Sequence, residues 1–226
     1  MKKISVEQNS KGFILLQDGK MLFTPLGKEM VLPSAEMAET LAGEWFAQGE
    51  KPRRDKMPLT CIACVAIDIV REQRDGVLDD ILSYTDTDLV CYRAGDTPEL
   101  AAIQQQAFEP LLQWLKPKLG IELLITDGVM PIKQPTDTRQ KYAAALKEYD
   151  EWHLAVLACI LKAISSLAIA FALLERRIDA KQAFHLSHLE EEFETSKWGK
   201  DDEKEERLIR LRLEIIAAGE FLKLLA

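Results

Sequence analysis

Residues 154–174, LAVLACILKAISSLAIAFALL, decide how the rest of the chain is read. The segment has 21 residues, enough for a helix to cross a bilayer. However, Lys162 lies near its middle and Ser165-Ser166 follows. A lysine at the centre of a membrane helix costs about 2.5–3.5 kcal/mol. We therefore expect a buried central helix, within one long helix or two in series over 136–175, and no membrane insertion.

The sequence after this segment predicts two further helices joined by a tight corner. A helix over about 179–196 is followed by Trp198-Gly199, and glycine is typical of a helix end. Asp201 and Asp202 then suit the positive end of the next helix. Apolar residues in that last helix, 202–225, form one seam, at Leu208, Leu211, Ile215, Ala218, Leu222 and Leu225.

The N-terminal residues have the pattern of strands. Asp18-Gly19 separates apolar runs at 13–16 and 21–23, which predicts a hairpin. Residues 24–27 look like another turn, and Ser34 is a suitable N-cap for a helix. That helix should end at Gly49, and its apolar stripe is Ala38, Leu41, Ala42, Trp45 and Phe46.

Helices dominate from Pro58 onward. The pattern predicts helices over about 58–74, 77–84 and 97–119, the last with two internal prolines. A short strand or extended link is expected at 89–92 and a short strand at 121–126. The fold class is therefore α+β: a small β-rich N-terminal domain with one helix (1–50) and a larger all-helical C-terminal domain (57–226).

Charge and composition exclude several classes of protein. The net charge is −8 and the pI is near 5.1, which argues against nonspecific nucleic-acid binding. Four cysteines inside apolar runs do not form a disulfide framework, so we expect an intracellular setting. The first residues, MKKISVEQNS, lack the apolar run of a secretory signal.

Little in the sequence indicates catalysis. Cys61 and Cys64 form a CxxC, but apolar residues follow them, which favours buried small residues over redox chemistry. Cys91 and Cys159 are too isolated to complete a zinc site. Ser165 and Ser166 lack the context of a nucleophile elbow, and no phosphate-binding loop is present. We predict no enzyme activity and no cofactor.

One alternative from a different class remains open. His185 and His188 are three residues apart on a predicted helix, and Glu191 follows at the same spacing. A helical metal-binding protein or enzyme could use this region, as di-iron bundles use Glu-x-x-His pairs. A second such pair is missing from the sequence, so solvated surface residues are the preferred interpretation and we predict no metal.

An acidic cluster precedes the Trp-Gly corner. Glu190, Glu191 and Glu194 share a helix face, and no lysine nearby in the helix relieves their repulsion. Acidic runs are usually solvated helix faces. Here an aromatic residue adjoins the run, and Trp198 must either clamp two helices or be presented to a partner. The cluster is therefore a candidate docking site.

Several segments together resemble one known family, the ATP synthase alpha-subunit assembly chaperones. LEEEF (189–193) followed by WGKDDEKE (198–205) resembles the signature of that family. DGKMLFTP, LPSAEMAETLAGEW, MPLT and YTDTDLVCYRA resemble its earlier segments in the same order. The likeness covers about residues 15–225. Cys61 after MPLT and Phe108 before Glu109-Pro110 depart from the family pattern.

The resemblance implies a function. It implies a non-enzymatic protein that binds the free alpha subunit of the F-type ATP synthase and prevents its misassociation until assembly. We expect Glu190, Glu191, Glu194 and Trp198 to contribute to partner binding. The resemblance also implies a bacterial member, in the cytoplasm, and we expect it to act as a monomer.

Overall fold

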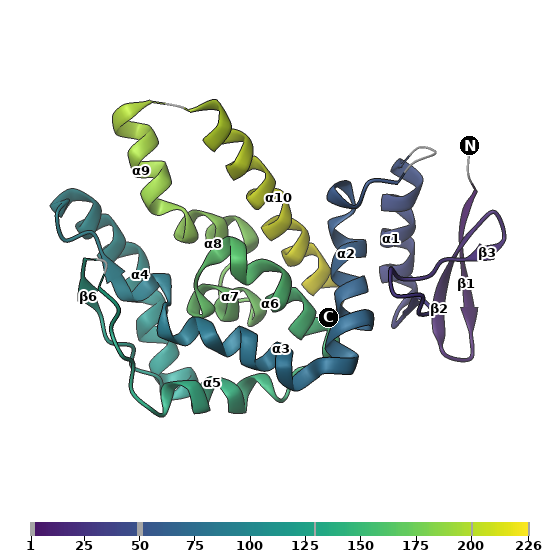
Figure 1. The fold of residues 1–226 in the computed structure, drawn as a ribbon, viewed down its shortest axis with the longest axis horizontal. Helices are drawn as coiled ribbons and strands as arrows, with labels where there is room; N and C mark the ends of the chain where they lie inside the picture. Colours follow the sequence, from purple (N-terminus) through teal and green to yellow (C-terminus); the bar gives the residue numbers. More distant parts are fainter. Residues whose placement is uncertain (1–2, 49–51, 129, 200, 226) are drawn as a thin grey trace.

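The computed structural model describes residues 3–48, 52–128, 130–199 and 201–225. A small antiparallel sheet with one helix lies at one end of the molecule, and a larger group of helices forms the rest (Figure 1). This arrangement confirms the predicted α+β class. The proposed domain boundary falls between helices α1 (Ala35–Ala47) and α2 (Pro58–Val65), and the division into two domains stays a prediction.

The sheet is built around its second strand, which pairs antiparallel with the other three. Its strands are β1 (Ile4–Asn9), β2 (Gly12–Gln17), β3 (Lys20–Met21) and β4 (Val31–Leu32). Asp18 and Gly19 connect β2 to β3 with φ values of 51° and 77°, as a two-residue hairpin turn requires, so the hairpin is confirmed. Gly12 allows β4 to approach, because a Cβ there would lie 2.7 Å from the Leu32 carbonyl oxygen.

Helix α1 begins where the sequence predicts. The backbone N–H of Met37 donates to Ser34 Oγ at 3.2 Å, which is an N-cap. Leu41 is fully buried, but Phe46 is 58% exposed, so the predicted apolar stripe is wrong at that position. The helix ends at Ala47, and the predicted stop at Gly49 lies outside the described residues.

A carboxylate from α1 caps the next helix. Glu44 accepts hydrogen bonds from the backbone N–H groups of Leu59 and Thr60, at 2.9 and 2.8 Å. These N–H groups lie in the first turn of α2 and have no partner within the helix. The cap therefore joins the N-terminal part of the chain to the helical part.

Helix α2 continues through the π-helical turn η2 (Ala66–Val70) into α3 (Arg71–Ser83). Gln73 has non-helical backbone angles, φ −131° and ψ 38°, and marks a kink. The predicted division between 58–74 and 77–84 is therefore a kink in a continuous path.

The middle of the chain contains two more helices and a short parallel strand pair. These elements are η3 (Tyr84–Asp86), η4 (Leu89–Cys91), β5 (Tyr92–Arg93), α4 (Pro98–Leu119), β6 (Thr126–Asp127) and α5 (Thr138–Leu146). Helix α4 has the predicted bounds and runs through both of its internal prolines. The predicted strands are much shorter than expected, because only β5 and β6 pair, over two residues each.

The central apolar segment is buried, as predicted, but it forms two helices. With α5, the range 136–175 holds three helices, so the expected one long helix or two in series is wrong. Helix α6 (Glu151–Ile164) ends at Ser165, whose φ of 54° is left-handed, and α7 (Leu167–Leu174) begins after Ser166. Ser166 Oγ caps α7 by accepting from the backbone N–H of Ile169 at 3.0 Å. All eight residues of α7 are buried in the core. Among the described residues, no helix is both long and apolar enough to span a membrane.

The C-terminal part contains three helices, α8 (Ala180–Ser187), α9 (Leu189–Trp198) and α10 (Asp202–Leu224). The expected single helix over 179–196 is broken at His188, where φ is −128°. In α10 the seam residues Ile215, Ala218 and Leu222 are buried, and this half of the helix packs on α6, α8 and α2. The first half of α10 has no fully buried residue.

Candidate partner-binding site

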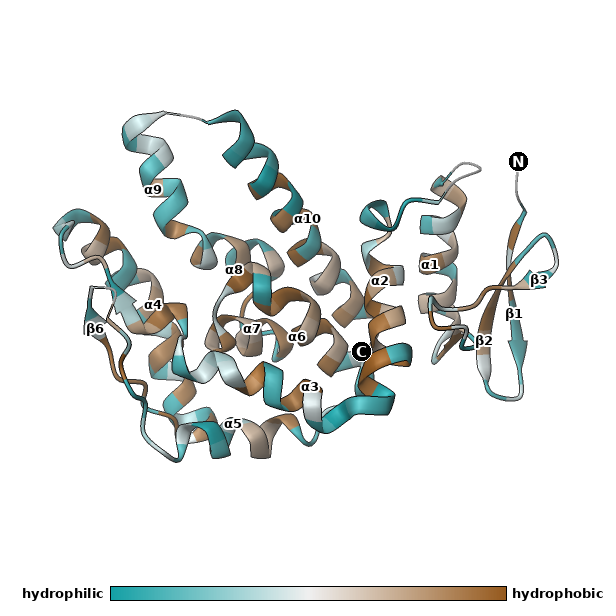
Figure 2. Ribbon diagram, in the orientation of Figure 1, coloured by the Kyte–Doolittle hydropathy of each residue, from teal (hydrophilic) through white to brown (hydrophobic). Residues whose placement is uncertain are grey.

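Helix α9 and the first half of α10 project from the helical core as a pair, which we call the arm (residues 189–213) (Figure 1). Leu189 is the only buried residue that either helix contributes within the described part of this range. Figure 2 shows the contrast between the hydrophilic arm and the hydrophobic helices α6 and α7. A polar helix pair that buries little of its own surface is available for a partner.

The three candidate glutamates lie together in a groove on the inner side of the arm. Glu190, Glu191 and Glu194 all line this groove, whose volume is about 780 Å³. Its other walls include residues of α4, α6 and α10, among them Phe108 and Lys162. The prediction that the glutamates share one surface is therefore confirmed geometrically, and their role in binding stays a prediction.

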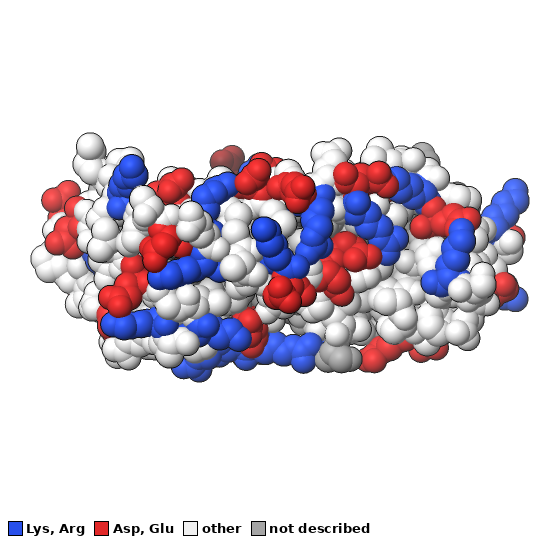
Figure 3. Space-filling view, turned by 90° about the horizontal axis from the view of Figure 1, so that it is seen from below, with Lys and Arg blue, Asp and Glu red and all other residues white. Residues whose placement is uncertain are grey.

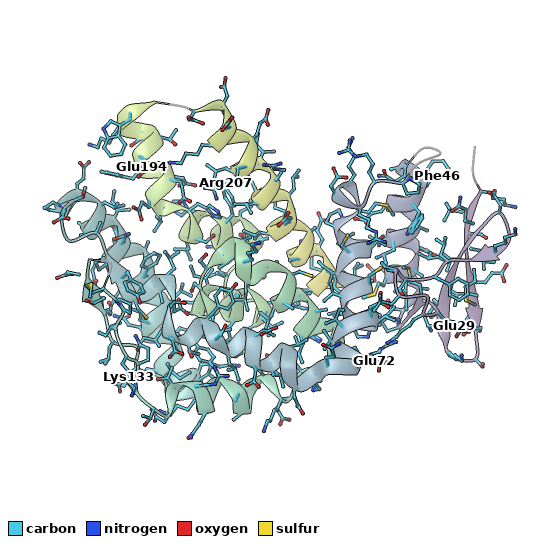
Figure 4. All side chains as sticks on the ribbon, viewed as in Figure 1. Glu29, Phe46, Glu72, Lys133, Glu194 and Arg207 are labelled. Carbon is cyan, nitrogen blue, oxygen red and sulfur yellow. The ribbon has the colours of Figure 1, made fainter. Side chains whose placement is uncertain are left out.

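Two of the three glutamates are paired with cations, so the expectation of an uncompensated cluster is wrong for Glu191 and Glu194. Lys204 Nζ lies 2.5 Å from Glu194 Oε2, and Arg207 Nη2 lies 3.3 Å from Glu191 Oε1. Both cations come from α10, which folds back beside α9, and Figure 4 shows Glu194 and Arg207 facing the space between the two helices. These ion pairs are partly exposed, so each contributes only about 0.2–1 kcal/mol to stability. Their main effect is to join the two helices of the arm.

Glu190 differs from its neighbours. It is exposed, and it forms no ion pair with any residue that the structure describes. Its charge therefore faces the groove without a cation from the arm, and it is the clearest position at which to test recognition of a basic partner surface.

Trp198 is presented to solvent. Its side chain is 77% exposed at the end of α9, so the interpretation as an interhelical clamp is wrong. It lines a hollow of about 930 Å³ at the tip of the arm, together with Lys204, Arg207 and Arg210. Acidic residues, among them Glu203 and Glu206, line the same hollow, so Trp198 stands among charges of both signs. Exposed tryptophans are frequent anchors at protein interfaces.

The sequence pattern did not identify two exposed apolar residues of the arm. Ile209 and Leu213 are exposed and lie four positions apart on α10, away from the buried seam. Their spacing places them on one helix face. The signal was present in the sequence as apolar residues outside the seam, but only the packing of α10 distinguishes its exposed face from its buried one.

The histidines do not assemble a metal site with Glu191. His185 is exposed and its Nδ1 lies 2.7 Å from Glu192 Oε2. His188 is buried, against the expectation of a surface residue, with Nδ1 2.9 Å from Ser187 Oγ and the ring stacked on Phe184. Among the described residues, no three His, Cys, Asp or Glu side chains converge as metal ligands. His185, His188 and Glu191 therefore have separate partners, which are Glu192, Ser187 and Arg207.

The CxxC lies inside helix α2. Burial raises the pKa of the Cys64 thiol to about 12, and it also raises the pKa of Cys61. A reactive cysteine needs a lowered pKa, because the thiolate is the nucleophile. The raised pKa values do not favour redox chemistry, but both side chains are half-buried, so the prediction that they are buried is wrong.

On the face seen from below, acidic and basic side chains are interspersed (Figure 3). Nucleic-acid binding depends on a surface with an excess of cations, and this face does not have that character.

The fold and the exposed, largely polar arm are compatible with a protein that acts by binding another protein. Comparison with known proteins agrees, since the family model described as ATP12 chaperone protein matches residues 1–116. The chain belongs to the ATP12 chaperone family.

Relatives with known structures or curated sequences support this assignment over nearly the whole chain. The crystal structure of Atp12 from Paracoccus denitrificans is 31% identical, with a TM-score of 0.90, and covers 99% of this chain and 96% of its own. The Atu1473 protein from Agrobacterium tumefaciens is 35% identical, with a TM-score of 0.93, over 100% of this chain and 85% of its own. Mitochondrial protein atp12 of Schizosaccharomyces pombe is 26% identical over 201 residues, in a match that covers 83% of this chain and 69% of that protein.

Proposed function

We propose that this chaperone binds the unassembled alpha subunit of the F-type ATP synthase and covers its interface surface until assembly. Membership of the ATP12 chaperone family supports a role in assembly. A subunit that awaits incorporation into a ring exposes apolar surface, which promotes wrong association. A chaperone that covers this surface reversibly needs no catalytic group. We place its action in the bacterial cytoplasm, as a monomer.

The observation that carries the proposal is the exposed arm, where Trp198 stands beside the acidic groove. An aromatic anchor next to charged residues is a common design for a specific interface. We propose that Trp198 enters a pocket on the alpha subunit and that Glu190 faces a cation there. Glu191 and Glu194 hold the two arm helices together through Arg207 and Lys204.

The test measures how tightly the chaperone captures purified alpha subunit. Glu190→Lys should weaken capture about tenfold, because reversal replaces an attraction by a repulsion worth about 1.4 kcal/mol. Trp198→Ala should weaken it further, since truncation of an anchor residue costs about 2 kcal/mol or more. Both side chains are exposed, so the melting temperature should stay close to that of the wild type.

The matched control is Glu148→Lys. Glu148 is also exposed and follows α5, which lies on the opposite side of the molecule from the arm (Figure 1). Glu148→Lys changes the net charge by the same amount as Glu190→Lys and should leave capture of the alpha subunit unchanged. Equal capture by Glu190→Lys, Trp198→Ala and the wild type would remove the arm from the interface, and no capture by the wild type would reject the alpha subunit as partner.

A further inference from the structure

A second concave surface lies far from the arm, where the β-rich part meets the helices. This surface, which we call the junction pocket, has a volume of about 500 Å³ between the 24–27 turn, the end of α1, and α2 with η2. Its walls are mainly apolar and include Phe23, Leu26, Met30, Trp45, Val65 and Ile69. Phe23 is 54% exposed and Leu26 is 65% exposed, so large apolar groups surround an open hollow.

The fold holds this surface open through one buried carboxylate. Asp68, in η2, accepts hydrogen bonds from Thr24 Oγ1 at 2.5 Å and from the backbone N–H of Leu26 at 3.2 Å. Thr24 Oγ1 in turn accepts from the backbone N–H of Lys28 at 3.1 Å. These bonds fix the 24–27 turn on η2, and the Leu26 side chain is presented at the rim. Both donors are neutral, so these bonds position the turn without cancelling the charge of the carboxylate, but Asp68 itself is buried.

Two charged residues line the pocket, and the exposed one is a cation, whereas Asp68 is buried. Arg54 lines the junction pocket, is exposed, and forms no ion pair with any residue in the described ranges. Arg53 and Asp55 neutralise each other, with Arg53 Nη2 2.5 Å from Asp55 Oδ2. Lys56 follows in η1 and is also exposed. An apolar hollow with a cationic rim complements an apolar side chain that is flanked by carboxylates.

We propose that the junction pocket is a second contact for the same client, and that it takes an apolar side chain from a client segment with acidic residues beside it. The inference rests on the proposed function, which supplies the client. A second copy of this chain is disfavoured as occupant, because its net charge of −8 opposes self-association. The chaperone then holds its client at the arm and at the opposite end of the molecule.

The test uses the full chain with ¹³C-labelled methionine methyl groups. Met30 and Met57 line the junction pocket, whereas Met130 is exposed near β6, on the other side of the molecule (Figure 1). The probes are a short peptide with Leu-Phe between runs of glutamate, and the same peptide with lysines. We expect the glutamate peptide to shift the methyl signals of Met30 and Met57 and to leave Met130 unchanged, and the lysine peptide to shift none.

Two variants decide whether the rim charge matters. Arg54→Glu should weaken binding of the glutamate peptide about fivefold and allow the lysine peptide to bind, since rim ion pairs are worth up to about 1 kcal/mol. The control Arg177→Glu has the same charge change at an exposed arginine after α7 and should have no effect. Equal shifts with both peptides, shifts at Met130 alone, or no shifts would overturn the proposal.

Capture of purified alpha subunit separates this inference from the proposed function. Leu26→Glu should weaken capture and remove peptide binding, whereas Glu190→Lys should weaken capture and leave peptide binding intact. If the wild type captures no alpha subunit but binds the glutamate peptide, the client assignment fails and the pocket chemistry stands. If Leu26→Glu captures as well as the wild type, or if it abolishes a dimer of the chaperone, the pocket is not a client contact.

Discussion

At Gly219, helix α10 packs closely against the start of helix α8. A Cβ atom added at Gly219 would lie 2.7 Å from the Cβ of Ala180, and the Cα and N atoms of Ala180 would be 3.8 and 3.9 Å away. The optimum separation of two carbon atoms is about 3.5–4.0 Å, so the clash is with the Ala180 methyl group and the two helices must separate by roughly 1 Å. Gly219→Ala tests whether this contact holds the C-terminal half of α10, which follows the arm, against the core.

Two opposing effects determine the size of the change. Overpacking costs typically about 1–3 kcal/mol in the free energy of unfolding. Replacing glycine by alanine inside a helix contributes about 1 kcal/mol in the other direction. Gly43 in α1 provides the second effect alone, because it is exposed and a Cβ there meets no atom within 4 Å. The difference between Gly219→Ala and Gly43→Ala should therefore be about 1–3 kcal/mol.

Urea unfolding, followed by far-UV circular dichroism, measures these differences. Gly43→Ala should raise the unfolding midpoint, and the midpoint of Gly219→Ala should be lower than that of Gly43→Ala. The double variant Ala180→Gly with Gly219→Ala should recover most of the loss, because it exchanges the two methyl groups across the same contact. The reasoning would be refuted if Gly219→Ala had the same unfolding midpoint as Gly43→Ala. It would also be refuted if the double variant were no more stable than Gly219→Ala alone.

Two further predictions concern the core. Burial raises the pKa of Asp88 to about 6, above its value near 3.8 in the unfolded chain. The protonated side chain therefore contributes fully to stability below pH 3.8, and this contribution is lost as the pH rises through 6. The loss is about 3 kcal/mol at neutral pH. The free energy of unfolding should therefore fall between pH 4.5 and pH 7 by more in the wild type than in Asp88→Asn, and parallel pH profiles would contradict the assignment. Phe171→Ala should cost about 3–5 kcal/mol in urea unfolding, because this fully buried ring contacts three other aromatic rings. Phe46→Ala, at an exposed phenylalanine, should stay within about 0.5 kcal/mol of the wild type, and equal losses for the two would count against the observed burial.

Sequence reasoning succeeded where neighbours along the chain decide the structure. The Asp18-Gly19 hairpin follows from the positive φ that both residues adopt, and the Ser34 cap follows from a bond to a backbone N–H three residues away. The predicted bounds of α4 agree with the observed ones, because they too depend on neighbouring residues along the chain. The two prolines inside α4 do not end the helix, so the expectation that an internal proline ends a helix is wrong there.

The failures lie where distant residues meet. The central apolar segment breaks at Ser165, and Asp88, from a loop far away in the sequence, accepts a hydrogen bond from the backbone N–H of Ala168 at 2.9 Å, in the first turn of α7. His188 is buried because the chain turns there between α8 and α9. The contact of Asp88 with α7 has no local signal in the sequence, whereas the partners of His188, Ser187 and Phe184, are its sequence neighbours.

The candidate site divides in the same way. The sequence by itself determined that acidic residues and a tryptophan gather before a helix corner, because helix periodicity and the glycine stop are local properties. It also determined the family resemblance and the α+β class. Only the tertiary structure decided that Lys204 and Arg207 neutralise two of the glutamates, and that Trp198 faces solvent. The physical reason is that ion pairing and exposure depend on how α10 folds back beside α9. The apolar half of α10 packs on the core, which brings Lys204 and Arg207 within reach of Glu194 and Glu191.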